Sequence, residues 1–368
     1  MMKKLNILFL LPLLLLVSCG NQNQETPTTS ATTTTPPTTT VAPTTTVTPP
    51  SSTTSGPKDD GLLRRTPHSL ISDPNWTQGF KLKSTTTVNA KVIGNLDYNQ
   101  TTTKEPFWEM AQWWTPDEYN FLNSNYTLLE ENVHQYENES RKAIIDTNNG
   151  SFQMTLNSEA EYLKNYGQKD KPSDKSWSHF LLEQNFDSSQ QFHMNMFESL
   201  TVSFDFSIDE CEYRGDKADG SQEAAQFLFY LRLFNTPAEG EDEKDVGRKN
   251  ANIWFGLPLF DSRYDFVGEY RQGDTGFVGA TGSLIYSISG TEFLDEKIQY
   301  KKTYHVKIDV LEYLKDAIIF GVMNNYLPNC QWKNMVLRYL NVGWELPGSF
   351  FASSTLSNLD ITYELVNE

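Results

Sequence analysis

The sequence of 368 residues predicts a mostly β protein, an antiparallel β-sandwich of the jelly-roll type, on three observations. Segments after residue 131 alternate between apolar and polar side chains, as strands with one buried face do. Turn-forming pairs such as Asn149-Gly150 and Gly273-Asp274 separate many of these segments. A single late helical pattern interrupts them. The sequence therefore predicts a sandwich with one late α-helix and a short aromatic-rich helical N-terminal appendage.

The first residues predict a secretory signal. Lys3 and Lys4 precede an apolar run over residues 5–17, and small residues follow. The four residues that end this region, Leu16-Val17-Ser18-Cys19, resemble the lipobox of bacterial lipoproteins. The resemblance implies a signal peptide over residues 1–18, cleavage before Cys19 and a lipid on its sulfur. The alternative is an ordinary signal peptide with a chance cysteine.

Residues 19–60 predict a lipid anchor followed by a disordered linker. Between Asn21 and Asp60, sixteen of forty residues are Thr and seven are Pro, and none is aromatic. Such a segment has too little apolar surface to offset the entropy of ordering, so we expect an extended tether. The predicted location is the outer face of a bacterial cell, with the protein anchored to the membrane by lipid.

The charge excludes some classes of partner. The formal net charge is −17, and loss of Lys3 and Lys4 with the signal peptide makes it −19. An acidic chain of this kind argues against nucleic acid and against a polybasic membrane patch. Besides Cys19, only Cys211 and Cys330 remain, either unpaired in the core or joined in one disulfide.

Residues 61–130 form an aromatic-rich segment that we expect to pack on the sandwich. Thr115-Pro116-Asp117-Glu118 has the spacing of a capping box, which predicts a short helix from Pro116. The neighbouring tryptophans are either a sugar-stacking patch or rings that cover a sheet. They are Trp108, Trp113 and Trp114.

Residues 131–368 form the predicted sandwich domain. The alternation predicts strands over residues 141–146, 151–156, 177–186, 199–209, 225–234, 252–260, 283–289, 303–310 and 356–365. Asp309 and Glu312 have capping-box spacing and open an apolar pattern of helical period from Val310 to Tyr326, which ends before Pro328.

Motifs for catalysis are absent from the sequence. No metalloprotease, nucleophile-elbow, phosphate-loop or dinucleotide motif occurs, and the five histidines lack metal-ligand spacing. The strand pattern over residues 131–368 resembles the concanavalin-A-like jelly rolls of secreted bacterial carbohydrate-active proteins, which include lectins, glycosidases and lyases. The resemblance implies a carbohydrate ligand. It transfers no catalytic residue, because the glycosidase and lyase strand motifs of that family are missing here.

Polar and aromatic residues on the expected strand faces form the candidate site. Sugar rings stack on aromatic side chains, while planar amides, guanidiniums and carboxylates bind hydroxyls. The candidate substrate-binding residues are Trp177, Gln226, Tyr230, Arg232, Arg263, Tyr264 and Trp344. The candidate catalytic groups are Glu183, Asp261 and Glu345 as acids and His179 as a base.

Each candidate has a structural alternative. Asp261 and Arg263 would pair with each other across a turn, Trp344 would belong to the core, and His179 would be a hydrogen-bonded sheet residue. No cofactor is expected. The acidic loop from Asp209 to Asp219 either holds calcium or is simply solvated, because it lacks the alternation of an EF-hand.

Two functions follow from the sequence. The first is a surface lipoprotein that binds carbohydrate on the concave face of the sandwich and, if it is an enzyme, acts as a glycoside hydrolase or polysaccharide lyase. The second is a structural or adhesion lipoprotein that binds a protein or host surface without catalysis. The first requires Arg232, Tyr230, Glu183 and Asp261 to converge in one cleft, and it fails if Arg232 and Glu183 lie on opposite sheets.

Overall fold

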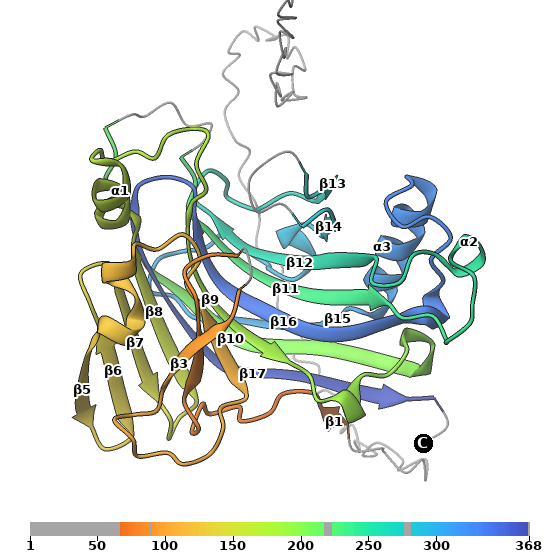
Figure 1. Ribbon diagram of the computed structural model, residues 1–368, viewed down its shortest axis with the longest axis horizontal. Helices are drawn as coiled ribbons and strands as arrows, with labels where there is room; N and C mark the ends of the chain where they lie inside the picture. The colour runs from red at the N-terminus through yellow and green to blue at the C-terminus, as the bar shows by residue number, and fades with distance from the viewer. Residues whose placement is uncertain (1–66, 88–89, 217–222, 276–280, 367–368) are drawn as a thin grey trace, which may run out of the picture. The chain divides into compact units, whose positions relative to one another are not determined.

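Two β-sheets build the part of the chain that the computed structural model describes, residues 67–87, 90–216, 223–275 and 281–366 (Figure 1). The predicted signal peptide, lipidation at Cys19 and linker lie outside the described residues. Among the described residues, no helix is both long and apolar enough to cross a membrane.

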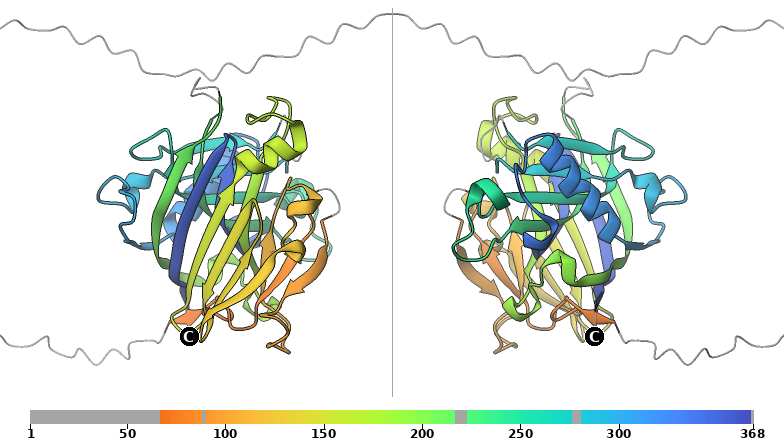
Figure 2. Two further views of the ribbon diagram at one scale, coloured as in Figure 1. Left: turned by 90° about the vertical axis from the view of Figure 1, so that its left-hand side faces the viewer. Right: turned by 90° about the vertical axis from the view of Figure 1, so that its right-hand side faces the viewer.

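The first sheet is wholly antiparallel and has the strand order β15-β10-β17-β8-β7-β6-β5, with β1 paired to β17. Its strands are β1 (His68–Ser69), β5 (Asn125–Glu130), β6 (Val133–Glu137), β7 (Arg141–Asp146), β8 (Ser151–Asn157), β10 (Phe197–Tyr213), β15 (Tyr304–Asp309) and β17 (Phe350–Leu365). Figure 2 shows β10, β17, β8 and β7 side by side across this sheet.

The second sheet has the order β13-β14-β12-β11-β16-β9-β4-β2-β3. Its strands are β2 (Phe80–Lys83), β3 (Val92–Leu96), β4 (Trp108–Ala111), β9 (Ser178–Asn185), β11 (Gln226–Asn235), β12 (Asn252–Asp261), β13 (Tyr270–Gly273), β14 (Leu284–Ser287) and β16 (Met335–Leu346). Two pairs in it, β12 with β14 and β2 with β4, are parallel. The predicted mostly β sandwich is confirmed.

The core lies between the two sheets and follows the predicted alternation. Phe204 and Phe206 of β10 contact Phe229 and Phe227 of β11 across the sheets, with ring centroids 5.3 and 6.3 Å apart. All four side chains are buried, and farther along β11 the half-buried Tyr230, Arg232 and Phe234 alternate with the buried Leu231 and Leu233. Burial of large rings from both sheets is what holds the layers together.

The late helix is α3 (Leu311–Met323), shorter than predicted at both ends. Val310 occupies the N-cap position, and the Asp309 carboxylate accepts a hydrogen bond from the Leu311 amide at 3.0 Å. Two helices were not predicted, α1 (Ser158–Tyr166), which Asn157 caps, and the single turn α2 (Glu243–Val246). Short 3₁₀ helices are η1 (Asp117–Tyr119), η2 (Phe121–Asn123), η3 (Ser188–Gln190), η4 (Met194–Met196), η5 (Gly290–Glu292) and η6 (Trp332–Asn334).

The N-terminal segment differs from the helical appendage that we expected. It supplies strands to both sheets, and the helix after Pro116 is only the 3₁₀ turn η1. The reason is the side chain of Thr115, which does not cap this turn. Its hydroxyl instead bonds the Arg141 guanidinium and the Glu161 carboxylate.

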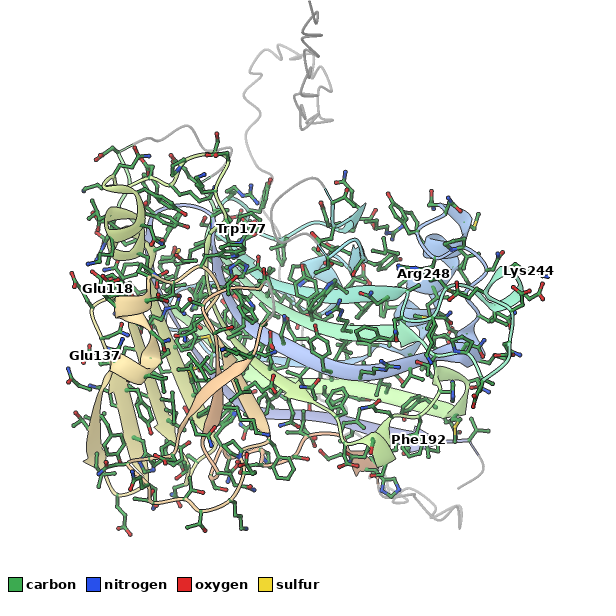
Figure 3. All side chains as sticks on the ribbon, in the orientation of Figure 1. Glu118, Glu137, Trp177, Phe192, Lys244 and Arg248 are labelled. Atoms are coloured by element: carbon green, nitrogen blue, oxygen red, sulfur yellow. The ribbon has the colours of Figure 1, made fainter. Side chains whose placement is uncertain are left out.

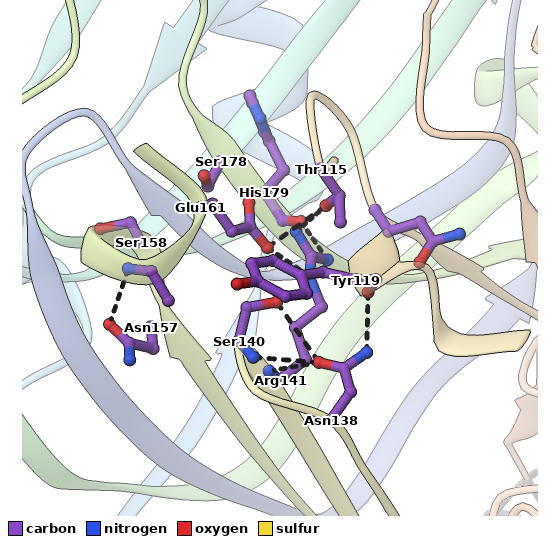
Figure 4. A network of polar contacts seen from close by, with 12 residues as sticks. Thr115, Tyr119, Asn138, Ser140, Arg141, Asn157, Ser158, Glu161, Ser178 and His179 are labelled. Atoms are coloured by element: carbon purple, nitrogen blue, oxygen red, sulfur yellow. Dashed lines mark hydrogen bonds and ion pairs between the residues drawn. The ribbon is translucent and has the colours of Figure 1, made fainter. Parts of the chain in front are cut away.

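A buried ion pair ties β7, α1 and β9 together (Figure 4). Arg141 Nε donates to Glu161 Oε1 at 2.8 Å, and both side chains are fully buried. Arg141 Nη1 also donates to the His179 carbonyl at 2.7 Å. Because a buried guanidinium without partners is costly, this network fixes the position of β9 beside α1.

Candidate functional site

The face of the second sheet that points away from the core carries most of the sequence-predicted site residues in register. Tyr230 of β11 lies opposite Asn341 of β16, which lies opposite Glu183 of β9. Residues directly opposite in antiparallel strands point to the same side. Tyr230, Arg232 and Glu183 therefore share one face of one sheet, so the arrangement that would exclude the site does not occur. Asp261, the fourth residue expected in the cleft, pairs with Arg263.

Four half-buried aromatic rings meet on this face and form what we call the ring platform, defined as Tyr230, Phe234, Trp254 and Tyr339. Ring centroids are 5.9 Å apart for Tyr230 and Trp254, and 5.5 Å apart for Trp254 and Tyr339. Phe234 and Tyr339 are 6.4 Å apart. These rings, unlike those of the core, keep exposed surface that a ligand can cover.

Arg232 lies among the rings of the platform. Its guanidinium carbon is 4.3 Å from the centroid of Trp254, 4.8 Å from Phe234 and 5.4 Å from Tyr339. Its Nε donates to Asn252 Oδ1 at 3.1 Å, and Nη1 donates to the Tyr339 hydroxyl at 2.6 Å. Burial raises the pKa of Tyr339, so this phenol is neutral at physiological pH.

Gly256 of β12 lets the ring of Tyr230 lie close to the backbone. A Cβ at this position would stand 2.5 Å from Tyr230 Cε1 and still closer to the Ser287 hydroxyl. Burial raises the pKa of Tyr230, and the Glu345 carboxylate raises it further. The phenol is thus a neutral hydroxyl at the edge of the platform.

Two carboxylates share one ammonium beside the platform. Lys83 of β2 contacts Glu109 of β4 at 2.9 Å and Glu183 of β9 at 2.7 Å. The ammonium also lies 5.6 Å from the centroid of Trp113. Burial lowers the pKa of Lys83, but the two carboxylates outweigh this effect and raise it above its ordinary value. Lys83 is therefore charged, and it holds both carboxylates in place.

A second cluster joins three sequence-predicted residues, Trp177, His179 and Glu345. Trp177 Nε1 donates to Glu345 Oε2 at 3.0 Å, and His179 Nε2 lies 3.4 Å from the same oxygen. The rings of Trp177, which Figure 3 labels, and His179 are stacked with centroids 5.7 Å apart. Burial alone would raise the pKa of Glu345, but His179 and the Trp177 hydrogen bond lower it below its usual range.

The charges at the end of β12, Asp261 and Arg263, are a structural pair. Asp261 is 1% exposed and accepts hydrogen bonds from Arg263 Nε at 2.9 Å and Nη2 at 2.6 Å. Gln226 of β11 donates to the same carboxylate at 2.8 Å. Tyr264, which is 56% exposed, lies under the Arg263 guanidinium at 5.2 Å. Because Arg263 and Gln226 both bond the Asp261 carboxylate, this group has a structural role, as the alternative of a pair across the turn predicted.

Trp344 requires a correction. It was a candidate for the binding face, with a place in the core as the alternative, and its side chain is fully buried between Phe227 and Phe260 in the core. Successive residues of a strand point to opposite faces, and Glu345, its neighbour, takes the outer one. Trp344 is a core residue.

Sequence reasoning missed five residues of this face, Lys83, Glu109, Phe234, Trp254 and Tyr339. Trp254 and Phe234 lie in segments that were predicted as strands, at positions that point to the same face as the polar residues of each strand. This shared face was the signal that could have identified them. Lys83, Glu109 and Tyr339 lie on strands that were not predicted, so no parity could be assigned to them.

The described residues hold no cluster of histidine, cysteine or acidic side chains suited to a metal ion. In the loop proposed for calcium, Asp209 instead bonds the side chains of Gln153, Ser207 and Thr355. Residues 217–219 of that loop lie outside the described part of the chain. Cys211 and Cys330 are free thiols, and burial raises the pKa of Cys330 to about 11.

Comparison with known proteins gave structural likeness only. No protein-family model matches the chain, and no curated protein matches it. Endoglucanase cel12A from Rhodothermus marinus is similar at 9% identity, over 66% of this chain and 97% of that one, with a TM-score of 0.35. A family 12 xyloglucanase from Bacillus licheniformis is similar at 10% identity over 66% and 97%, with a TM-score of 0.36. Because identities and scores are this low, the fold rests on the strand pairings described above.

Proposed function

We propose that the outer face of the second sheet binds a carbohydrate chain, and that the predicted lipid at Cys19 holds the protein at a bacterial surface. The ring platform is the observation that carries the proposal. Half-exposed rings in edge contact offer flat apolar surface for the C–H faces of sugars. Asn341, Arg232 and the Tyr230 hydroxyl lie beside the rings as hydrogen-bonding groups for sugar hydroxyls.

The carboxylates of this face support binding rather than hydrolysis. Glycoside hydrolysis needs one carboxylic acid that carries a proton and a second carboxylate nearby. Glu109 and Glu183 are adjacent, but both are held by the Lys83 ammonium, so neither carboxylate is free to act on a sugar. The pKa of Glu345 is lowered, because His179 and the Trp177 hydrogen bond outweigh the effect of burial. Hydrolysis is therefore the second candidate, and it would require Lys83 to leave one of its two partners.

Binding to a panel of soluble polysaccharides tests the proposal. Trp254→Ala removes the central ring, and we expect it to weaken binding by about 2 kcal/mol, roughly 30-fold in Kd, as loss of an interface aromatic does. Trp332→Ala is the matched control, because Trp332 lies in η6 with its ring 5.8 Å from the Lys315 ammonium, outside the platform. We expect wild-type affinity from the control.

Two outcomes would contradict the proposal. One is that no polysaccharide in the panel binds, and the other is that Trp254→Ala binds as tightly as the wild type. Binding of a host-surface protein that survives Trp254→Ala would instead favour the adhesion alternative. Release of reducing ends from a bound polymer, abolished by Glu183→Gln, would establish the hydrolytic candidate.

A further inference from the structure

Two half-buried arginines of the described residues, Arg232 and Arg338, contact no carboxylate in that part of the chain. Arg248 contacts none there either, but it is exposed to solvent. In a chain of net charge −17, carboxylates are abundant, so a half-buried guanidinium without one is the exception. The other described arginines each contact a carboxylate oxygen at 2.6 to 2.8 Å, namely Arg141, Arg214, Arg263 and Arg271.

Both of these half-buried guanidiniums contact the same ring. Arg232 and Arg338 each have the guanidinium carbon 4.8 Å from the centroid of Phe234. The two like charges thus lie within twice that distance of each other. Aromatic faces stabilise a cation, but they do not satisfy its N–H donors. The pair thus brings positive charge to the ring platform without contact to a carboxylate of the described residues.

Hydrogen bonds among the described residues leave donors of this pair unused. Arg338 Nη2 donates to the Thr236 hydroxyl at 2.8 Å, while its Nε–H is buried without an acceptor among the described residues. Burial lowers the pKa of Arg338, the direction expected of a cation that lacks a counter-charge. Arg232 donates to Asn252 and Tyr339, both neutral. A guanidinium has five N–H donors, so several remain.

A register shift brings the two arginines together. Arg232 of β11 pairs with Tyr339, whereas the next residue, Leu233, pairs with Leu337. The extra residue between them is Arg338. A bulge of this kind turns a side chain to the face opposite to the one that regular alternation would give it. Arg338 and Tyr339, although adjacent, are accordingly both partly exposed.

We propose that Arg232 and Arg338 form a subsite for an oxyanion of the bound saccharide, so that the ligand is an acidic polysaccharide. This inference rests on the proposed function. The planar fork of arginine matches a uronic carboxylate or a sulfate ester, both of which present two or more oxygens to it. The ring platform would stack the sugar that carries the anion.

The subsite is tested on the full-length protein with pairs of polysaccharides that share one sugar backbone and differ only in whether they carry an anionic group. Dextran sulfate is compared with dextran, and polygalacturonate with its methyl ester, which separates sulfate from carboxylate as the anion. We expect at least one acidic polymer to bind more tightly than its neutral counterpart, with an affinity that falls as salt rises. Arg338→Gln should weaken that binding by about 10- to 100-fold, the range for loss of a charged hydrogen bond, and leave neutral polymer unaffected.

Arg214→Gln is the matched control. Arg214 also lies over a ring, 4.4 Å from the centroid of Phe351, but it pairs with Glu212. This variant should bind both polymers of each pair as the wild type does. Circular dichroism establishes that all variants are folded, and Arg232→Lys, which keeps the charge but loses the fork, provides a second variant.

The outcomes separate this inference from the proposed function. Equal binding of acidic and neutral polymers, or unchanged binding by folded Arg338→Gln and Arg232→Lys, overturns the subsite and leaves the carbohydrate proposal standing. Binding of free sulfate or acetate that Arg338→Gln abolishes, with no polymer bound, supports the anion site and overturns the carbohydrate ligand. No binding of either anions or polymers overturns both.

Discussion

Removal of one charge from the buried pair of Arg141 and Glu161 should destabilise the protein severely. Glu161→Gln keeps the shape of the side chain and an oxygen that can accept from Arg141 Nε, but it removes the negative charge. At 2.8 Å and an effective dielectric constant of about 20, the attraction lost is about 6 kcal/mol. The neutral glutamine avoids the cost of burying a charged carboxylate, which offsets part of this attraction. We therefore expect the free energy of unfolding to fall by about 3–5 kcal/mol.

Glu161 Oε2 adds to the cost of this substitution. That oxygen is buried without a hydrogen-bond partner among the described residues. The amide group introduced by Glu161→Gln would place a donor either there, without an acceptor, or against the Arg141 guanidinium, where donors repel. An unsatisfied buried donor costs about 1–3 kcal/mol, which keeps the expected loss at the upper part of the range.

Urea denaturation followed by tryptophan fluorescence measures the loss as a lower midpoint with an unchanged slope. The double variant Arg141→Met/Glu161→Met tests the reasoning, because replacing both charges leaves no unpaired ion. It should be more stable than Glu161→Gln, although it forfeits the Arg141 bonds to Thr115 and His179. A loss below about 1 kcal/mol for Glu161→Gln, or a double variant no more stable than Glu161→Gln, would refute the charge-pair account.

Two further predictions concern the outer face. Gly256→Ala should displace the Tyr230 ring, cost about 1–3 kcal/mol by overpacking and weaken polysaccharide binding, and an unchanged midpoint in urea would contradict it. Glu345→Gln should lose stability at pH 6 but much less at pH 3. Because the folded pKa of Glu345 lies below its ordinary 4.5, its contribution is complete above that value and is lost as pH falls through the lower one. An equal loss at both pH values in urea titrations would exclude this ionisation as the cause.

The strands with strict alternation could be predicted from the sequence, and the others could not. The segment over residues 225–234 became β11, and that over residues 252–260 became β12, with Asp261 as its last residue. β16 was missed because Arg338 and Tyr339 both face outward at the bulge, so the period of two breaks in its middle. β2, β3 and β4 have four or five residues each, too few to show a period.

The candidate site was partly predictable for the same reason. Tyr230, Arg232 and Glu183 were assigned to one face because parity within a strand is a local property. Lys83 and Glu109 join Glu183 only through the pairing of β2, β4 and β9, which brings together residues 100 positions apart. Pairing between distant strands depends on the whole topology. No local pattern could have revealed that an ammonium stands between the two carboxylates.

The carboxylates and the guanidiniums of the outer face differ in whether the protein itself supplies a partner of opposite charge. Each carboxylate near the platform is held internally, Glu109 and Glu183 by Lys83, and Glu345 by His179 and Trp177. The guanidiniums of Arg232 and Arg338 have rings and neutral acceptors but no counter-charge among the described residues. A ligand that brought a cation would have to displace an internal partner, whereas a ligand that brought an anion would complete an unpaired charge without breaking a contact. If this face binds saccharide as proposed, its electrostatics would therefore favour an acidic sugar over a basic one.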